Sequence, residues 1–226
     1  MENTTPQSPV LIYTEQTPNP ETLKFVTNRM LYKGTADFKE VNAAKEWSPI
    51  ATELFQFPYV KGVYVCNNFV TVSKEFNYAW ETILLPLKEF IKEYVANGSE
   101  IITEGYAEAM LAVEAENSKH EVHTGEQSET VKKIKELIDT YVKPAVEMDG
   151  GNIEFKSFSE GIVTVTLQGS CSGCPSSTVT LKSGIEGMLK RMVPEVTEAR
   201  EGFVHCYEMN GTAAEAELRF ILRDFE

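Results

Sequence analysis

Short runs of β-branched and aromatic residues dominate the start of the chain. Two such runs, 10–14 and 24–27, flank Thr17-Pro18-Asn19-Pro20. Because the prolines favour an extended turn, we predict two edge-type strands here. A further pair of runs within 63–72 is separated by Asn67-Asn68, a dipeptide that tolerates the positive φ of a tight turn. This pattern predicts a β-hairpin.

Helical spacing follows at two places. Ser48 is a typical N-cap residue and Pro49 suits the first helical position, which predicts a short helix. A longer helix is predicted from Trp80 onward, and Pro86 either kinks it or marks its true start. The apolar residues at helical spacing in this segment are Ile83, Leu84, Leu87, Phe90, Ile91 and Tyr94.

The region after residue 128 repeats this mixture of helices and strands. An amphipathic helix is predicted first, interrupted at Lys143-Pro144. Two strands are predicted over 153–158 and 162–167, joined by a short turn. The apolar stripe of the helix consists of Val131, Ile134, Leu137, Ile138 and Tyr141.

Charge divides the 226 residues into balanced and acidic parts. Of the formal net charge of −13, the segment 97–127 holds −6 and the segment 201–226 holds −4. Balanced charge is typical of folded domains, and acidic, glycine- and serine-containing segments are typical of linkers. We therefore predict an α+β protein with two small domains, 8–96 and 128–200, each a short, mostly antiparallel sheet packed with helices. The acidic linker 97–127 joins them, and an acidic tail, 201–226, follows.

The linker and the tail each leave two interpretations open. In the linker, Tyr106, Met110 and Val113 are compatible with one or two helical turns, whereas its alanines and glutamates also suit a solvated spacer. In the tail, a capping-box pattern at Thr212 favours a short amphipathic helix over a hairpin around Asn210-Gly211.

Composition excludes several classes of protein. A hydrophobic content of 42% is ordinary for a globular chain. No apolar stretch approaches the roughly 20 residues that a membrane span requires. A net negative chain lacks the positive field that nucleic-acid binding needs. The first ten residues show no basic start followed by an apolar run, so we expect a cytoplasmic protein.

The candidate chemistry lies at Cys171 and Cys174, just before Pro175, which is expected to open a helix that Pro194 ends. A spacing of three lets both sulfurs reach one metal centre, and Gly173 permits the backbone twist that such a loop needs. The amides and dipole at the start of the helix stabilise thiolates and the negative charge of a thiolate-ligated cluster. The sequence therefore predicts a metal or cluster site here.

One chain does not supply enough ligands for this site. Structural zinc and iron–sulfur clusters usually take four protein ligands, whereas this loop supplies two. We interpret His120 and His123 as solvated linker residues, and Cys66 and Cys206 as small buried or half-buried hydrophobic residues. The simplest remaining source is the same loop of a second chain, so we predict a homodimer that holds one cluster across a two-fold interface.

Two regions resemble a known family. Residues 129–199 resemble the C-terminal domain of NifU-like (Nfu) iron–sulfur scaffold proteins, and residues 11–95 resemble the N-terminal domain of the same family. The motifs that carry the first resemblance are Lys143-Pro144-Ala145-Val146, Asp149-Gly150-Gly151, the run from Gln168 to Ser177, Thr180-Leu181-Lys182-Ser183-Gly184-Ile185-Glu186 and Val193-Pro194-Glu195-Val196. Those that carry the second are Gln16-Thr17-Pro18-Asn19-Pro20, Thr22-Leu23-Lys24-Phe25, Ser48-Pro49 with Leu54-Phe55, Gly62-Val63, Phe69-Val70-Thr71-Val72 and Trp80.

This resemblance implies a [4Fe–4S] cluster bridged between two chains by paired cysteines, here Cys171 and Cys174. It further implies upstream cluster-assembly proteins as the source of the cluster and apo iron–sulfur proteins as its recipients. Because only two thiolates per chain would hold the cluster at a surface loop, an incoming thiolate can replace one ligand at a time.

Two other interpretations of the cysteine pair stay open, a thiol–disulfide redox protein and a structural zinc-bridged dimeric adaptor. The chain contains no Ser/His/Asp group, no suitable pair of carboxylates and no phosphate-binding glycine loop. We therefore expect a carrier and not an enzyme.

Overall fold

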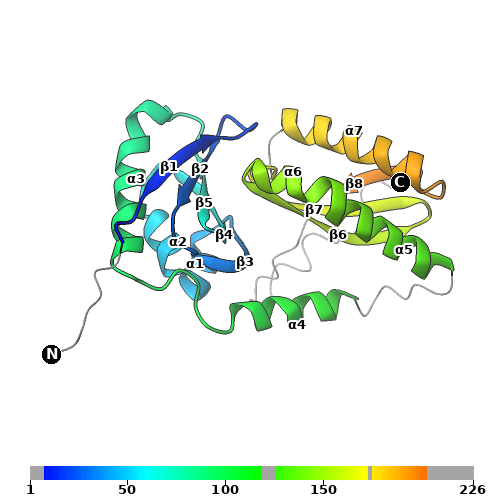
Figure 1. The fold of residues 1–226 in the computed structure, drawn as a ribbon, viewed down its shortest axis with the longest axis horizontal. Helices are drawn as coiled ribbons and strands as arrows, with labels where there is room; N and C mark the ends of the chain where they lie inside the picture. The colour runs from blue at the N-terminus through cyan, green and yellow to red at the C-terminus, as the bar shows by residue number, and fades with distance from the viewer. Residues whose placement is uncertain (1–7, 119–125, 173–174, 203–226) are drawn as a thin grey trace, which may run out of the picture.

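The computed structural model describes residues 8–118, 126–172 and 175–202. The predictions for the tail beyond residue 202, and those for His120, His123 and Cys206, fall outside these residues. The described chain forms two α+β parts that pack side by side (Figure 1). This confirms the predicted fold class.

The N-terminal part is a five-stranded antiparallel sheet with strand order β1-β2-β5-β4-β3. Helices cover one face of this sheet, and the other face points toward the C-terminal part (Figure 1). The elements are β1 (Ile12–Gln16), β2 (Thr22–Thr27), β3 (Tyr32–Phe38), α1 (Val41–Trp47), α2 (Pro49–Leu54), β4 (Val60–Asn67), β5 (Phe69–Lys74) and α3 (Trp80–Ala96).

Several local predictions for this part are confirmed. The β4–β5 hairpin turns at Asn67, which has a φ of 48°. The Ser48 side chain accepts a hydrogen bond from the N–H of Ala51 and so caps α2. Helix α3 begins at Trp80 and runs through Pro86, so this proline does not mark its start.

Other predictions for this part are incomplete or wrong. Strand β1 is an edge strand, as predicted, but β2 lies between β1 and β5 and is therefore interior. Strand β3 and helix α1 were not predicted. Gly34, Lys33 and Asp37 interrupt the apolar pattern of the β3 sequence, and its pairing with β4 is irregular between Tyr32 and Thr35.

The start of the acidic linker is a helix that packs on the N-terminal part. Helix α4 (Tyr106–Ser118) begins with a buried tyrosine. The ring of Tyr106 lies 6.1 Å from the ring of Tyr32 and 5.9 Å from each of the rings of Phe38 and Trp47, measured between centroids. Of the two interpretations of this segment, the helix is therefore the one observed, and its first turn is part of a core.

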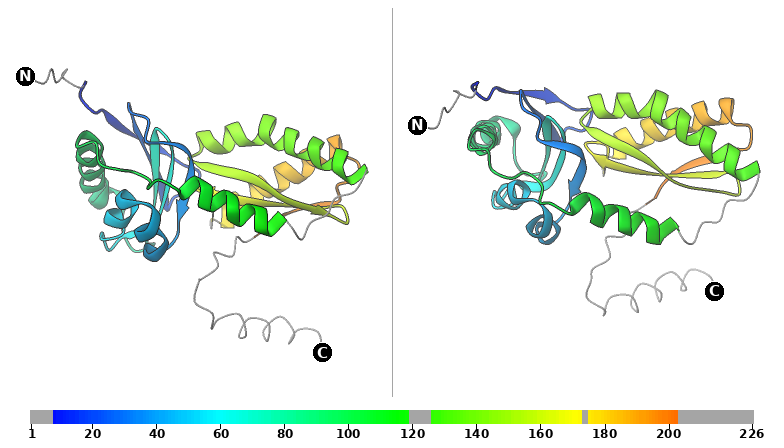
Figure 2. Two further views of the ribbon diagram at one scale, coloured as in Figure 1. Left: turned by 90° about the horizontal axis from the view of Figure 1, so that it is seen from below. Right: turned by 60° about the horizontal axis from the view of Figure 1, so that its bottom comes forward.

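The C-terminal part is a three-stranded sheet covered on one face by helices (Figure 2). Strands β6 and β7 are antiparallel, as predicted, and β8 pairs with β7 in parallel through the crossover helix α7. The elements are α5 (Glu126–Leu137), a π-helical turn η1 (Ile138–Val142), α6 (Lys143–Met148), β6 (Gly151–Ser159), β7 (Ile162–Gly169), α7 (Pro175–Met192) and β8 (Glu198–Glu201).

The π-turn changes which residues of the first helix of this part are buried. Ile134 and Ile138 lie in the core as predicted, but Tyr141 is 61% exposed and Val142 is buried in its place. A π-turn adds one residue to a helical turn, so every later side chain is rotated around the axis. The prediction for Tyr141 was therefore wrong. Pro144 lies at the start of α6, directly after the π-turn.

Among the described residues, no helix is both long and apolar enough to cross a membrane.

Candidate functional site

The cysteine loop follows strand β7 and precedes helix α7. Cys171 lies two residues after the end of β7, and Pro175 opens α7 as predicted. Cys174 lies in the segment 173–174, outside the described residues. The structure thus places one of the two predicted ligands.

Cys171 is held at the edge of the C-terminal core. It is 6% exposed and belongs to the same buried cluster as Ile153 and Leu167. Gly151, at the start of β6, lies directly beside it. A Cβ atom on Gly151 would lie 2.9 Å from the Sγ of Cys171 and 2.6 Å from the carbonyl oxygen of Gln168. The glycine at position 151 therefore leaves the space that the sulfur occupies.

Hydrogen bonds join the cysteine loop to the turn at residues 149–151. The Ser170 hydroxyl donates to the carbonyl oxygen of Asp149 at 2.6 Å, and the Ser170 N–H donates to the carbonyl oxygen of Gly150 at 3.2 Å. The Ser170 Oγ also lies 3.7 Å from the Cys171 Sγ. Two motifs that are separate in the sequence therefore form one unit in the fold.

Asn152 braces the strands that lead into this unit. Its side chain is fully buried, and Nδ2 donates to the Oε1 of Glu154 at 2.9 Å and to the Oε1 of Gln168 at 3.0 Å. Sequence reasoning did not single out Asn152, because the contact with Gln168 depends on the register of β6 and β7. The sequence feature that could have identified Asn152 is its position directly after Asp149-Gly150-Gly151.

The described residues contain no complete metal site. Among them, no group of three or more histidine, cysteine or acidic residues could hold a metal ion. Cys66 is 2% exposed and packs with Val26, Tyr64 and Phe69. Burial raises the pKa of the Cys66 thiol, which disfavours the thiolate. Its interpretation as a small buried residue is confirmed.

Burial also raises the pKa of Asp149, whereas the nearby charge of Lys24 lowers it. Lys24 belongs to the N-terminal part, so both parts of the chain contribute to the surroundings of the cysteine loop.

Comparison with known proteins identifies both parts. The family model "NifU-like domain" matches residues 134–200, and the model "Scaffold protein Nfu/NifU N terminal" matches residues 12–98. These matches confirm the resemblance that the sequence motifs predict.

Curated relatives named "NFU1 iron-sulfur cluster scaffold homolog, mitochondrial" are similar over most of the chain. The Drosophila willistoni protein is 40% identical over 202 residues, which cover 88% of this chain and 66% of the relative. The Drosophila grimshawi protein is 40% identical over 194 residues, which cover 85% of this chain and 61% of the relative. The Homo sapiens protein is 39% identical over 189 residues, which cover 83% of this chain and 70% of the relative.

The chain thus spans slightly less than two thirds of the length of the two fly relatives and slightly more than two thirds of the human one. With both domain models matched in order, the chain belongs to the Nfu family of iron–sulfur cluster scaffold proteins.

Proposed function

We propose that this protein carries a [4Fe–4S] cluster between two copies of the chain and transfers it to apo-proteins. The observation that supports this most directly is the position of Cys171. It lies at a strand end, next to the start of a helix and braced by the turn at residues 149–151, in a chain of the Nfu family.

The chemistry of the loop suits a cluster as cargo. Thiolates are the usual protein ligands of iron–sulfur clusters, and four are the usual number. Cys171 and Cys174 supply two from each chain, so two chains complete the set. A ligand set divided between two chains can also be exchanged one thiolate at a time, and this favours transfer over storage.

The proposed partners follow from this role. Upstream cluster-assembly proteins provide the cluster, and apo iron–sulfur proteins receive it through their own cysteines. The relatives are named as scaffold proteins, which supports a carrier without a catalytic activity of its own.

Anaerobic reconstitution with iron and sulfide tests the proposal. We expect broad visible absorption, a Mössbauer spectrum typical of [4Fe–4S], and a shift from monomer to dimer on a sizing column. Cys171→Ser should abolish the absorption and the shift. Cys66→Ser is the matched control, because Cys66 is a similarly buried cysteine on the other part of the chain, and it should leave both intact. A Cys171→Ser protein that still holds a full cluster would contradict the proposal.

Transfer is measured separately, by mixing the loaded dimer with an apo-enzyme that regains activity on receiving a [4Fe–4S] cluster. The two alternative functions predict different results. A zinc-bridged adaptor gives bound zinc without visible absorption, and a thiol–disulfide redox protein reduces insulin disulfides.

A further inference from the structure

The sheet of the N-terminal part is buried on both faces. One face packs against α1, α2 and α3. The opposite face, which we call the outer face, carries residues that are each 8% exposed or less. An antiparallel sheet of a small domain commonly leaves its second face to solvent. The residues of the outer face are Lys24, Val26, Tyr64, Cys66, Phe69 and Thr71.

The turn at residues 149–151 and the preceding helix α6 cover the outer face (Figure 1). The Thr71 hydroxyl donates to the carbonyl oxygen of Gly150 at 2.8 Å. The Lys24 ammonium donates to the carbonyl oxygen of Met148 at 3.1 Å, at the end of α6. A cation is favoured there, because the last carbonyl groups of a helix have no partner within the helix.

Asn19 reaches the cysteine loop itself. Its side-chain Nδ2 donates to the carbonyl oxygen of Ser170 at 3.1 Å, one residue before Cys171. Its Oδ1 accepts the N–H of Glu21 at 3.0 Å, which fixes the orientation of the amide. Asn19 is buried, although it lies in a turn between two strands.

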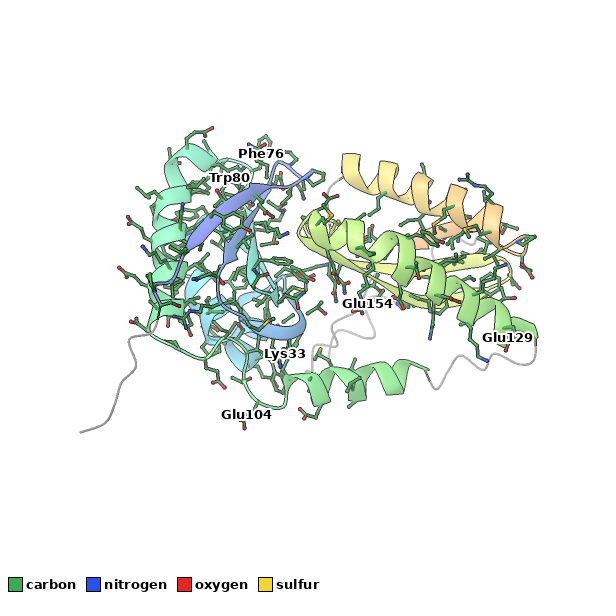
Figure 3. The ribbon with its side chains drawn as sticks, viewed as in Figure 1. Lys33, Phe76, Trp80, Glu104, Glu129 and Glu154 are labelled. Atoms are coloured by element: carbon green, nitrogen blue, oxygen red, sulfur yellow. The ribbon has the colours of Figure 1, made fainter. Side chains whose placement is uncertain are left out.

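This turn is held by hydrogen bonds within the N-terminal part itself. Trp80, labelled in Figure 3, donates its Nε1–H to the carbonyl oxygen of Pro20 at 2.9 Å. The Thr17 hydroxyl and the Thr22 N–H both donate to the carbonyl oxygen of Asn19, at 2.9 and 3.0 Å. Asn19 is therefore presented in a fixed position, and little conformational entropy is lost when it binds Ser170.

Two glycines of the C-terminal part allow the close approach. A Cβ atom on Gly150 would lie 2.9 Å from the Oγ1 of Thr71, and one on Gly169 would lie 2.8 Å from the Cδ1 of Tyr64. Both glycines have a positive φ, of 82° and 63°. Gly150 belongs to the turn at residues 149–151 and Gly169 to the motif that contains the cysteines, so the backbone of both motifs lies directly against the outer face.

We propose that the N-terminal part is a cap: its outer face docks onto the cysteine loop of its own chain and must leave before two loops can share a cluster. The contacts of Asn19, Lys24 and Thr71 with the C-terminal part support the docking. Its consequence for cluster loading rests on the proposed function, because Asn19 occupies the surface beside Cys171 that the loop of a second chain has to approach.

Docking is tested on the metal-free full-length chain with Thr71→Arg. The larger, charged arginine side chain cannot fit against Gly150, whereas on an undocked sheet it would be exposed to water. Thr82→Arg is the matched control, since Thr82 is exposed on α3, on the far side of the sheet. The reporter is Cys66, whose alkylation by iodoacetamide is followed by mass spectrometry of its peptide.

We expect Thr71→Arg to raise the alkylation rate of Cys66 by about tenfold or more over the wild type, because the outer face then opens to solvent. Thr82→Arg should leave the rate unchanged. Asn19→Ala removes the hydrogen bond to Ser170 and the one that Glu21 donates within the turn, without adding bulk, and should raise the rate by a smaller factor. Circular dichroism verifies that each variant is folded. Equal rates for the wild type and both interface variants, when all are folded, would overturn the docking.

The consequence for loading is then measured with the same variants. Under anaerobic reconstitution at limiting iron and sulfide, Thr71→Arg should reach its final absorption faster than the wild type and than Thr82→Arg. If alkylation shows docking and all three proteins load at the same rate, the cap has no role in loading. If none of them loads a cluster, the proposed function fails while the docking result stands.

Discussion

At the scale of single residues, Gly151 leaves no room for a side chain beside Cys171. Gly151→Ala should destabilise the C-terminal part by about 1 to 3 kcal/mol, because the added methyl group meets the sulfur and the carbonyl oxygen of Gln168. Urea unfolding measures the change. Gly184→Ala is the control, since a Cβ atom on Gly184 would have no neighbour within 4 Å and alanine favours a helix. Gly184→Ala should leave the free energy of unfolding unchanged or raise it. Equal losses of stability in both variants would contradict a steric role for position 151.

Asp37 gives a second prediction at this scale. Burial raises its pKa to about 6, although Lys39 lies 3.9 Å away and the Gly169 N–H donates to its carboxylate. An unfolded Asp titrates near 4, so the native state binds the proton more tightly, and stability falls as pH rises from about 4 to about 6. At pH 7.5, Asp37→Asn should therefore be more stable than the wild type by about 1 to 3 kcal/mol, a gain that shrinks toward pH 4.

Denaturant unfolding of the wild type and Asp37→Asn at pH 7.5 and pH 4.5 tests whether the stability gain shrinks at the lower pH. A gain for Asp37→Asn that is independent of pH would indicate a cause other than titration.

Single residues also show which features of the site the sequence could predict and which it could not. The helix start at Pro175 was predictable, because proline at a first helical position has a local physical reason. The pairing of Cys171 with Cys174 as ligands stays a prediction from their spacing. Asn19 was predicted only as part of a turn. Its bond to Ser170 spans 151 residues of sequence, and no local pattern encodes such a contact.

At the scale of elements, the π-turn η1 decides which face of a helix is buried. Val142→Ala should cost about 1 to 3 kcal/mol, because it removes two methyl groups from a filled core. Tyr141→Ala should change stability by no more than about 0.5 kcal/mol, since Tyr141 is exposed. Urea unfolding of the two variants compares the sites directly. The reverse order would show a regular α-helix through residues 138–142.

The elements that sequence missed have few local signals. Strand β8 has the sequence Glu-Ala-Arg-Glu, without β-branched or aromatic residues, and it is a strand because the crossover helix α7 returns it beside β7. Caps and turn residues, in contrast, marked the hairpins and the helix starts correctly. Local chemistry thus predicted how elements begin and end, whereas pairing between distant segments determined the rest.

At the scale of the whole molecule, the arrangement of the two parts changes when a cluster is loaded, if the cap has the proposed role. Lys24 and Lys74 are similarly buried, at 8% and 7% exposed. The ammonium of Lys24 donates to the C-terminal part, whereas that of Lys74 donates to the carbonyl oxygen of its neighbour Glu75. On cluster loading, acetylation of Lys24 should rise about tenfold, while that of Lys74 stays constant.

Mass spectrometry of chains treated with an acetylating reagent before and after reconstitution measures both lysines in one sample. Equal protection of Lys24 in the two states would show that the parts stay docked around a bound cluster. From sequence alone Lys24 is predicted only as a strand residue, because its partner, the end of α6, lies more than a hundred residues away.

The packing of Tyr106 has a consequence for competition between chains. Since α4 continues from the core of the N-terminal part, the span between the two parts begins at Ser118, and only seven residues, 119–125, separate it from α5 in sequence. If the N-terminal part acts as the proposed cap, so short a separation in sequence gives it an effective concentration of the order of millimolar at the cysteine loop of its own chain. A second chain in solution at micromolar concentration competes poorly on contacts alone. A ligand that both loops share, such as the proposed cluster, would then shift the balance from one chain closed on itself to two chains joined.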